Sequence, residues 1–233
     1  MKPEILEAFN SVKLAFAQTQ KEMENLEESF SHLNLVTKKN ETFDYRPIVI
    51  IIGHTRHAGG ASNANMNIDE FKYNTGIAAK ISEALSDFER EIMITSKTVT
   101  DSLLQETKTS AQLMYEINDL DPLFVISLHC NAFNKKATGT EVLYAEGDKL
   151  SAMIAQTLLD YLIDALELRD RGTKSKKRED RGGYLLHGIK SPCVISEPFF
   201  IDNDYDLGMA LKNEDRIVGA YVDAIIDIES ELS

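Results

Sequence analysis

Three polar side chains stand at the ends of apolar segments, where α/β proteins usually place their chemistry. His54 follows the run IVIIIG, His129 follows VISL, and Glu197 closes the run CVISE. Ligands bind in such proteins beyond the carboxyl ends of the strands. Two histidines and a carboxylate from separate elements make a common catalytic zinc set that leaves one position for water. A further glutamate nearby would take a proton from that water. The pattern is consistent with a zinc hydrolase, although each histidine taken alone would also fit a structural role.

Three more residues belong to the candidate set. Glu70 falls in the first turn of an expected helix, where a carboxylate also simply favours the positive helix terminus. His57 lies in the Gly-rich segment HTRHAGG and offers an extra imidazole, for which an exposed loop position is the plainer interpretation. His187 shortly precedes the strand of Glu197, and we expect it to be structural or substrate-facing rather than a metal ligand.

The elements that must position these residues alternate between strand and helix. Expected strands are 48–53, 91–95, 123–129, 139–145 and 193–197, and expected helices are 69–88, 101–118 (capped by Thr100 or Asp101), 149–166 and 207–228. This alternation predicts an α/β fold with a mainly parallel, twisted sheet flanked by helices. The basic stretch 169–181 is interpreted as a solvated loop with room for a local anion contact.

Residues 1–36 differ from the rest of the chain. Apolar residues from Ile5 to Leu33 alternate steps of four and three, with Thr19 as the one polar member, which is a heptad pattern. A helix of that extent would be ~46 Å long. Its apolar stripe either packs on the catalytic domain or pairs two chains as a homodimer, and the pattern does not separate these alternatives. Residues 37–46 are expected to be a linker, and 47–233 the catalytic domain.

Composition excludes several classes of function. A net charge of −13 argues against binding nucleic acid through its phosphates. No apolar run approaches the ~20 residues that a membrane span requires, and the N-terminus lacks the apolar region of a secretory signal. Cys130 and Cys193 make no disulfide framework and are expected to be free and buried.

Several segments, taken together and in order, resemble a known enzyme family. The chain from residue 47 onward is similar to the zinc-dependent N-acetylmuramoyl-L-alanine amidases of amidase type 3, and most of all to phage and prophage endolysins. The segments that carry the resemblance are IIGHTRHAGGASN, DEFKYN, VISLHCNAFNKKATGTEVLYA and SPCVISEPFFIDNDYD. The loop after His54 departs from the Gly-Gly-x-Asp form often found in the family.

The resemblance implies a role for each candidate. His54, Glu70 and His129 would bind Zn²⁺, and Glu197 would be the catalytic glutamate. Asn131 follows the family's His-x-Asn pattern and would hold the site or the substrate. The implied reaction is hydrolysis of the amide between the lactyl group of N-acetylmuramic acid and L-alanine in peptidoglycan, by water that zinc activates.

Two other functions fit parts of the same pattern. A zinc peptidase or deacylase acting on another amide would need the same four site residues. A structural particle component, assembled by the heptad helix around a relic domain, would not need all four. As an endolysin, the protein would be made in the bacterial cytoplasm without a signal peptide and would act on the cell wall after release.

Overall fold

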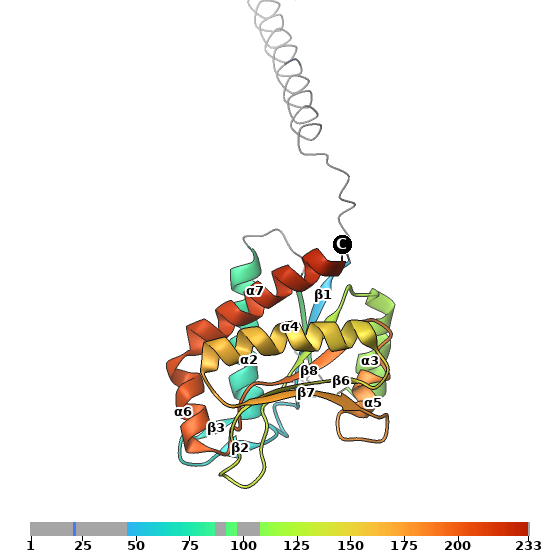
Figure 1. Ribbon diagram of the computed structural model, residues 1–233. Coiled ribbons are helices and arrows are strands. Elements are labelled where there is room, and N and C mark those ends of the chain that lie inside the picture. The colour runs from blue at the N-terminus through green and yellow to red at the C-terminus, as the bar shows by residue number, and fades with distance from the viewer. Residues whose placement is uncertain (1–20, 22–45, 87–91, 97–107, 233) are drawn as a thin grey trace, which may run out of the picture. The chain divides into compact units, whose positions relative to one another are not determined.

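The structure of the chain is a computed structural model that describes residue 21 and residues 46–86, 92–96 and 108–232 (Figure 1). The heptad pattern in 1–36, its pairing between chains and the linker therefore lie outside the described residues, apart from Lys21 and Arg46. In the described part a six-stranded sheet has the order β4-β1-β5-β8-β6-β7, and a two-stranded ribbon pairs β2 with β3.

The bounds of the elements follow the expected alternation. The strands are β1 (Ile48–Ile52), β2 (Ser62–Asn63), β3 (Ile68–Asp69), β4 (Ile92–Ser96), β5 (Val125–Leu128), β6 (Thr140–Ala145), β7 (Asp170–Lys176) and β8 (Cys193–Glu197). The helices are α2 (Glu70–Ser86), α3 (Ser110–Leu120), α4 (Lys149–Leu166), α5 (Gly183–Leu186), α6 (Asp204–Lys212) and α7 (Glu214–Leu232).

The central sheet is mainly parallel, as the sequence predicts. β1 pairs in parallel with β4 and β5, and β5 pairs in parallel with β8. β6 runs antiparallel to β8, and β7 runs parallel to β6. The expected α/β fold is confirmed, with one antiparallel junction between β8 and β6.

Both faces of the sheet are covered by helices. In β1, Ile48, Ile50 and Ile52 face the core formed with α2, α4 and α7. Val49 and Ile51 point to the opposite face and pack with residues of α3 and α5. Side chains alternate across a strand, so a strand buried on both faces is apolar throughout. This explains why the run IVIII identifies a central strand.

Two expected elements are wrong in detail. The stretch 169–181 is not only a loop, because its first half forms β7, an edge strand of polar and charged residues. Charged side chains are a common way to keep an edge strand from pairing with another molecule, and they remove the apolar signal. The single helix expected over 207–228 is two helices, α6 and α7, which meet at Asn213.

The start of α3 also differs from expectation. Thr109, rather than Thr100 or Asp101, caps the helix, and the two expected caps lie outside the described residues. The hydroxyl of Thr109 accepts a hydrogen bond from the backbone N–H of Gln112, whose side chain accepts one from the N–H of Thr109. This reciprocal pair is a capping box. None of the helices in the described ranges is long and apolar enough to cross a membrane.

Candidate metal centre and active site

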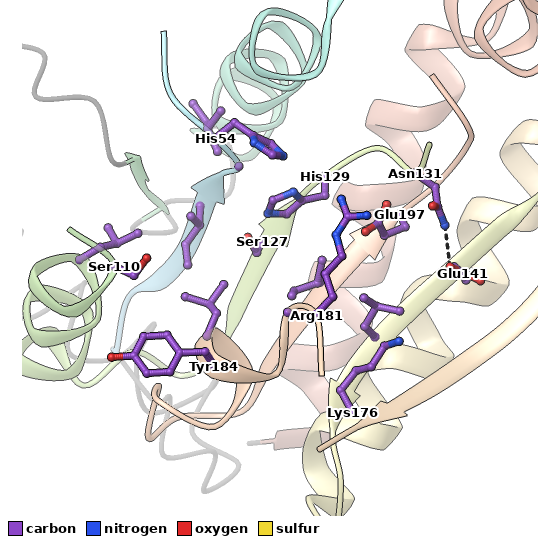
Figure 2. A pocket seen from close by; sticks show the side chains of 18 residues that line it. His54, Ser110, Ser127, His129, Asn131, Glu141, Lys176, Arg181, Tyr184 and Glu197 are labelled. Atoms are coloured by element: carbon purple, nitrogen blue, oxygen red, sulfur yellow. Dashed lines mark hydrogen bonds between the residues drawn. The ribbon is translucent and has the colours of Figure 1, made fainter. Parts of the chain in front are cut away.

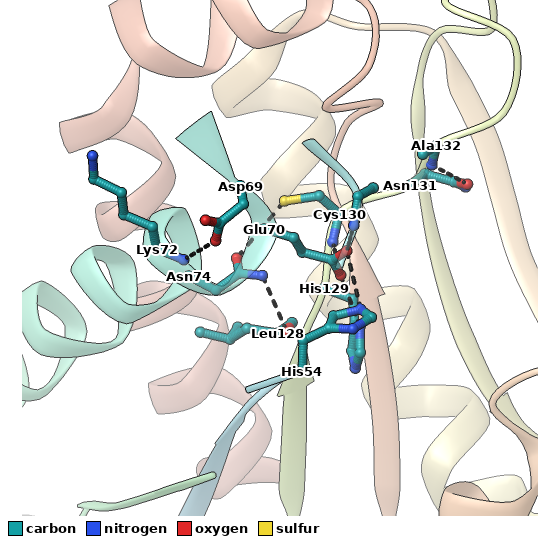
Figure 3. A network of polar contacts seen from close by, with 11 residues as sticks. His54, Asp69, Glu70, Lys72, Asn74, Leu128, His129, Cys130, Asn131 and Ala132 are labelled. Carbon is teal, nitrogen blue, oxygen red and sulfur yellow. Dashed lines mark hydrogen bonds and ion pairs between the residues drawn. The ribbon is translucent and has the colours of Figure 1, made fainter. Parts of the chain in front are cut away.

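Three neighbouring strands deliver the candidate residues to one edge of the sheet. β1, β5 and β8 are adjacent and parallel, and their register aligns the ends of all three. His54 follows β1 by two residues, His129 follows β5 directly, and Glu197 is the last residue of β8. The rings of the two histidines meet edge to face, with centroids 5.1 Å apart. The structure therefore brings the ends of β1 and β5 together, with His54 beside His129 (Figure 3).

Glu70 lies between the two histidines. It is the first residue of α2 and only 1% exposed. Its Oε1 lies 2.9 Å from Nδ1 of His129 and accepts the backbone N–H of Cys130, while its Oε2 accepts the backbone N–H of Ala61 and lies 3.1 Å from Nε2 of His54. Burial by itself raises the pKa of Glu70, but the interactions with His129 and His54 outweigh it and lower the pKa to about 2. Glu70 is thus a carboxylate at neutral pH.

Two glycines lie so close to His54, Glu70 and His129, hereafter the triad, that neither has room for a Cβ atom. His54 adopts a left-handed conformation with φ of 66°, which is uncommon for a residue with a side chain and turns the chain sharply after β1. A Cβ on Gly53 would lie 2.5 Å from the ring of His129, and one on Gly60 would lie 2.5 Å from Oε2 of Glu70. Both glycines permit this close approach because they lack a side chain.

The donor set fits a zinc ion. His54, Glu70 and His129 each offer one ligand atom, and these atoms lie within 4.8 Å of one another. Although Nε2 of His54 is close to Glu70, the geometry is not that of a hydrogen bond, and this buried nitrogen has no hydrogen-bond partner among the described residues. A buried ring nitrogen without a partner is costly unless another group uses it. Two imidazoles and one carboxylate are typical ligands of catalytic zinc.

Glu197 stands beside the triad in a different environment. It is 9% exposed, and its Oε2 has no hydrogen-bond partner in the described ranges. Burial, followed by the negative charge of Glu70, raises the pKa of Glu197 to about 8, and Arg181 opposes that shift. A carboxyl group poised near neutral pH can both accept and donate a proton.

A cavity of about 460 Å³ opens in front of these groups (Figure 2). Its volume is in the range of about 300–1,000 Å³ that small-molecule sites usually occupy. Its apolar lining comes from both sheet and helices: Ile51, Ile52, Leu113, Leu143, Leu185 and Ile195. Its polar lining includes His54, Ser127, His129, Asn131, Glu141, Lys176, Arg181 and Glu197.

Asn131 lines the cavity within a chain of polar contacts that the sequence did not reveal. Its Nδ2 donates to Oε1 of Glu141 at 2.6 Å, and Nε of Arg171 donates to Oε2 of the same carboxylate at 2.8 Å. Arg171 also stacks over the ring of Phe200. Glu141 sits opposite Glu197 in the antiparallel register of β6 and β8. The one sequence feature that could have indicated Glu141 was a charged residue within the mostly buried strand TEVLYA.

The two remaining candidate histidines do not line the cavity. His57 is exposed, and the ring of His187 is half-buried and donates from Nε2 to the carbonyl of Lys176. The cavity instead contains Ser127, Lys176 and Arg181, which sequence reasoning did not select. The two cations belong to the basic stretch 169–181, so its charge was the signal that could have located them.

Comparisons with known proteins place this geometry in a family. The family model Amidase_3, N-acetylmuramoyl-L-alanine amidase, matches residues 48–227. An uncharacterized cell wall amidase of Bacillus anthracis is 27% identical over 189 residues, which are 76% of this chain and 34% of that protein. The chain thus spans about a third of the length of this relative.

Solved structures show the same fold. N-acetylmuramoyl-L-alanine amidase from Clostridium difficile 630 superposes with a TM-score of 0.67 at 22% identity, over 79% of this chain and 97% of that one. The catalytic domain of the CD27L endolysin, which targets Clostridia difficile, superposes with a TM-score of 0.65 at 24% identity, over 78% of this chain and 97% of that one. The family match covers most of the chain and the fold agrees with it, so the chain belongs to the Amidase_3 family of N-acetylmuramoyl-L-alanine amidases.

Proposed function

We propose that the protein is a zinc-dependent peptidoglycan amidase that hydrolyses the amide between the lactyl group of N-acetylmuramic acid and L-alanine. The observation that carries this proposal is the compact set of His54, Glu70 and His129, whose two histidines line the same cavity as Glu197. Family membership and the cell wall amidase of Bacillus anthracis support the substrate class.

His54, Glu70 and His129 would hold the zinc ion. When bound there, zinc supplies the Lewis acidity that activates water and polarises the attacked carbonyl. Glu70 balances the charge of the ion as a buried carboxylate. It also orients His129, because the contact with Nδ1 fixes the ring in the site.

Glu197 would move the proton. It accepts the proton of the attacking water and returns it to the nitrogen of the leaving L-alanine, so that the amine departs neutral. Its ionised form is favoured by positive charge in the cavity, to which Arg181 and Lys176 contribute. Asn131, held by Glu141, would position the substrate in front of Glu197.

The protein would act on the bacterial cell wall as a phage or prophage endolysin. The similarity to the catalytic domain of an endolysin supports this role. It is tested by adding the purified protein to bacteria and to isolated walls. Lysis from outside or release of wall fragments is the expected result.

The function is tested by comparing the native chain with Glu197→Gln and His129→Ala. We expect about one zinc ion per chain in the native protein and in Glu197→Gln, and much less in His129→Ala. Amidase activity is measured by labelling new amino termini after wall digestion. Loss of the general acid–base should lower kcat by about 10²–10⁴-fold in Glu197→Gln.

Each alternative outcome has a distinct meaning. New L-alanine amino groups released only by the native chain would support the amidase. Zinc binding without wall cleavage would favour a peptidase or deacylase that acts on another amide. Absence of zinc from the native chain would contradict the ligand set.

A further inference from the structure

The basic stretch 169–181 contributes one side of the cavity. Lys176 is the last residue of β7, and Arg181 lies in the turn that leads from β7 to α5. Both side chains line the cavity that also contains Glu197. In Figure 2 the Arg181 side chain extends toward the strand ends that carry His129 and Glu197.

Neither cation is neutralised by a carboxylate in the part of the chain that the structure describes. No described aspartate or glutamate forms an ion pair within 4.0 Å of Lys176 or Arg181. Several other basic side chains are engaged in such pairs: Lys80, Lys108, Arg171 and Arg216. Lys176 and Arg181 thus place two positive charges in one cavity of a chain whose net charge is −13.

The carboxylates of the cavity are engaged elsewhere or lie farther away. Glu141 accepts from Asn131 and Arg171, so its two oxygens are already used. Glu197 lies in the same cavity but beyond ion-pair distance from both cations. The positive charge of Lys176 and Arg181 is therefore available to an anionic group of a ligand.

We propose that Arg181 and Lys176 form a subsite for a carboxylate of the stem peptide next to the scissile amide. This inference rests on the proposed function. The residue after L-alanine in peptidoglycan stems is D-glutamate, which carries a free α-carboxylate unless it is amidated to D-isoglutamine. The subsite makes the enzyme prefer acidic stems to amidated ones.

Guanidinium chemistry suits this role. Arginine binds a carboxylate through two parallel N–H donors, and such charge-assisted bonds are about twice as strong as neutral ones. Lys176, at the end of β7, adds a second positive charge to the cavity. The hydroxyl of Ser127, which is buried in the cavity lining and has no partner among the described residues, is a further group that a bound peptide can satisfy.

The test uses two soluble substrates that differ in one group. Both are N-acetylmuramoyl-L-alanyl peptides, one continuing with D-glutamate and the other with D-isoglutamine. KM and kcat are measured separately for the native zinc-loaded chain, Arg181→Gln, Lys176→Gln and the control Lys177→Gln. Lys177 is the exposed neighbour of Lys176 and does not line the cavity. Thermal unfolding of each variant checks that it folds.

We expect the native chain to have a KM roughly 10-fold or more lower for the acidic substrate, as hydrogen bonds to charged groups commonly provide. Arg181→Gln should remove most of that preference by raising KM for the acidic substrate only. Because Arg181 also favours the ionised form of Glu197, any fall of kcat in this variant should be equal for the two substrates. Lys176→Gln should remove a smaller part, and Lys177→Gln none. Binding of both substrates is also measured without turnover, in Glu197→Gln and in the double variant that adds Arg181→Gln. The single variant should bind the acidic substrate more tightly, and the double variant should lose most of this preference.

Several results would overturn the subsite. Equal KM values for the two substrates in the native chain would do so while leaving the amidase proposal intact. A KM preference that survives unchanged in Arg181→Gln, with only an equal fall of kcat for both substrates, would show that Arg181 acts through Glu197 alone. If the zinc-loaded native chain cleaves neither substrate and Glu197→Gln binds neither, the proposed function fails together with the subsite.

Discussion

Two buried glutamates of the site have pKa values that move in opposite directions. Burial raises the pKa of Glu70, but His129, His54 and the backbone N–H of Cys130 outweigh it and lower this pKa to about 2. The pKa of Glu197 is raised to about 8, because burial and the charge of Glu70 are not offset by a close partner. Neighbouring carboxyl groups with divergent pKa values commonly divide the roles in a mechanism. In the proposed mechanism Glu70 is the permanent anion and Glu197 the proton carrier.

This difference predicts how the stability of the metal-free protein depends on pH. The folded state binds the proton of Glu197 more tightly than the unfolded state does, so this contribution is complete below about pH 4.5 and is lost as the pH rises to about 8. The loss amounts to at most about 5 kcal/mol of unfolding free energy. Urea unfolding of the metal-free chain at pH 5, 6, 7 and 8 measures it.

Glu197→Gln provides the comparison, because its amide does not titrate. Its unfolding free energy should decline less over the same range than that of the native chain. Glu70 does not interfere, since its lowered pKa affects stability only below about pH 4.5. Parallel curves for the two proteins would contradict the shift of Glu197.

The space beside the triad predicts the effect of one added methyl group. In Gly60→Ala the new Cβ would lie 2.5 Å from Oε2 of Glu70 and 2.6 Å from the ring of His54, at a φ of +81°. Both proposed ligands must shift, so zinc affinity should fall about 10–100-fold, as it does when the support of metal ligands is disturbed. Competition with a chromogenic chelator measures the affinity.

Gly76→Ala is the matched control, since nothing lies within 4 Å of the added methyl group on the exposed side of α2. It should leave zinc affinity unchanged and raise stability by about 0.5–1 kcal/mol. An equal effect of both substitutions on zinc binding would show that steric crowding at Gly60 is not the cause.

At the scale of elements, the first turn of α6 forms hydrogen bonds with both the segment that follows β5 and the segment that follows β8. Asp206 is fully buried and accepts hydrogen bonds from the hydroxyl of Thr138, at 2.5 Å, and from the backbone N–H groups of Gly139 and Phe200. Next to this junction, the backbone of Asn131 pairs with the segment after β8. The loops that border the cavity are thereby fixed to one helix.

Asp206→Asn tests this junction. The amide has one acceptor oxygen instead of two and places an N–H₂ group among buried donors, so the unfolding free energy should fall by about 2–4 kcal/mol. Asp215→Asn is the control, because the side chain of Asp215 is 98% exposed and a change within about 0.5 kcal/mol is expected. Denaturant unfolding measures both. A loss of similar size in the two variants would contradict the structural role of Asp206.

At the scale of the whole molecule, the site draws on residues from His54 to Glu197, all within the family match of 48–227. We propose that residues 1–36 are separable from catalysis. Deleting them should leave zinc content and kcat on a soluble muramyl peptide within about 2-fold. Light scattering of both proteins would show whether the heptad segment pairs two chains. Loss of zinc on deletion would instead make this segment part of the catalytic core.

The sequence by itself determined the central strands and the residues at their ends. Runs such as IVIII and CVIS are apolar on both faces, because the sheet they form is covered on both sides. The histidines and glutamates that follow these runs had to appear at one edge of the sheet, since parallel strands end together. For this reason His54, His129 and Glu197 could be selected without coordinates. Glu70, in the first turn of a helix, was predicted to be a metal ligand only through the family resemblance.

Only the tertiary structure decided what else shares the cavity. Lys176 and Arg181 come from a polar edge strand and a turn, whose residues carry no apolar periodicity to predict their place. Glu141 reaches the site because β6 runs antiparallel to β8, and a local pattern does not encode the direction of pairing between distant segments. His187, at the end of α5, donates a hydrogen bond to the carbonyl of Lys176 at the end of β7. This contact depends on how α5 and the preceding turn pack, which a local sequence pattern does not encode.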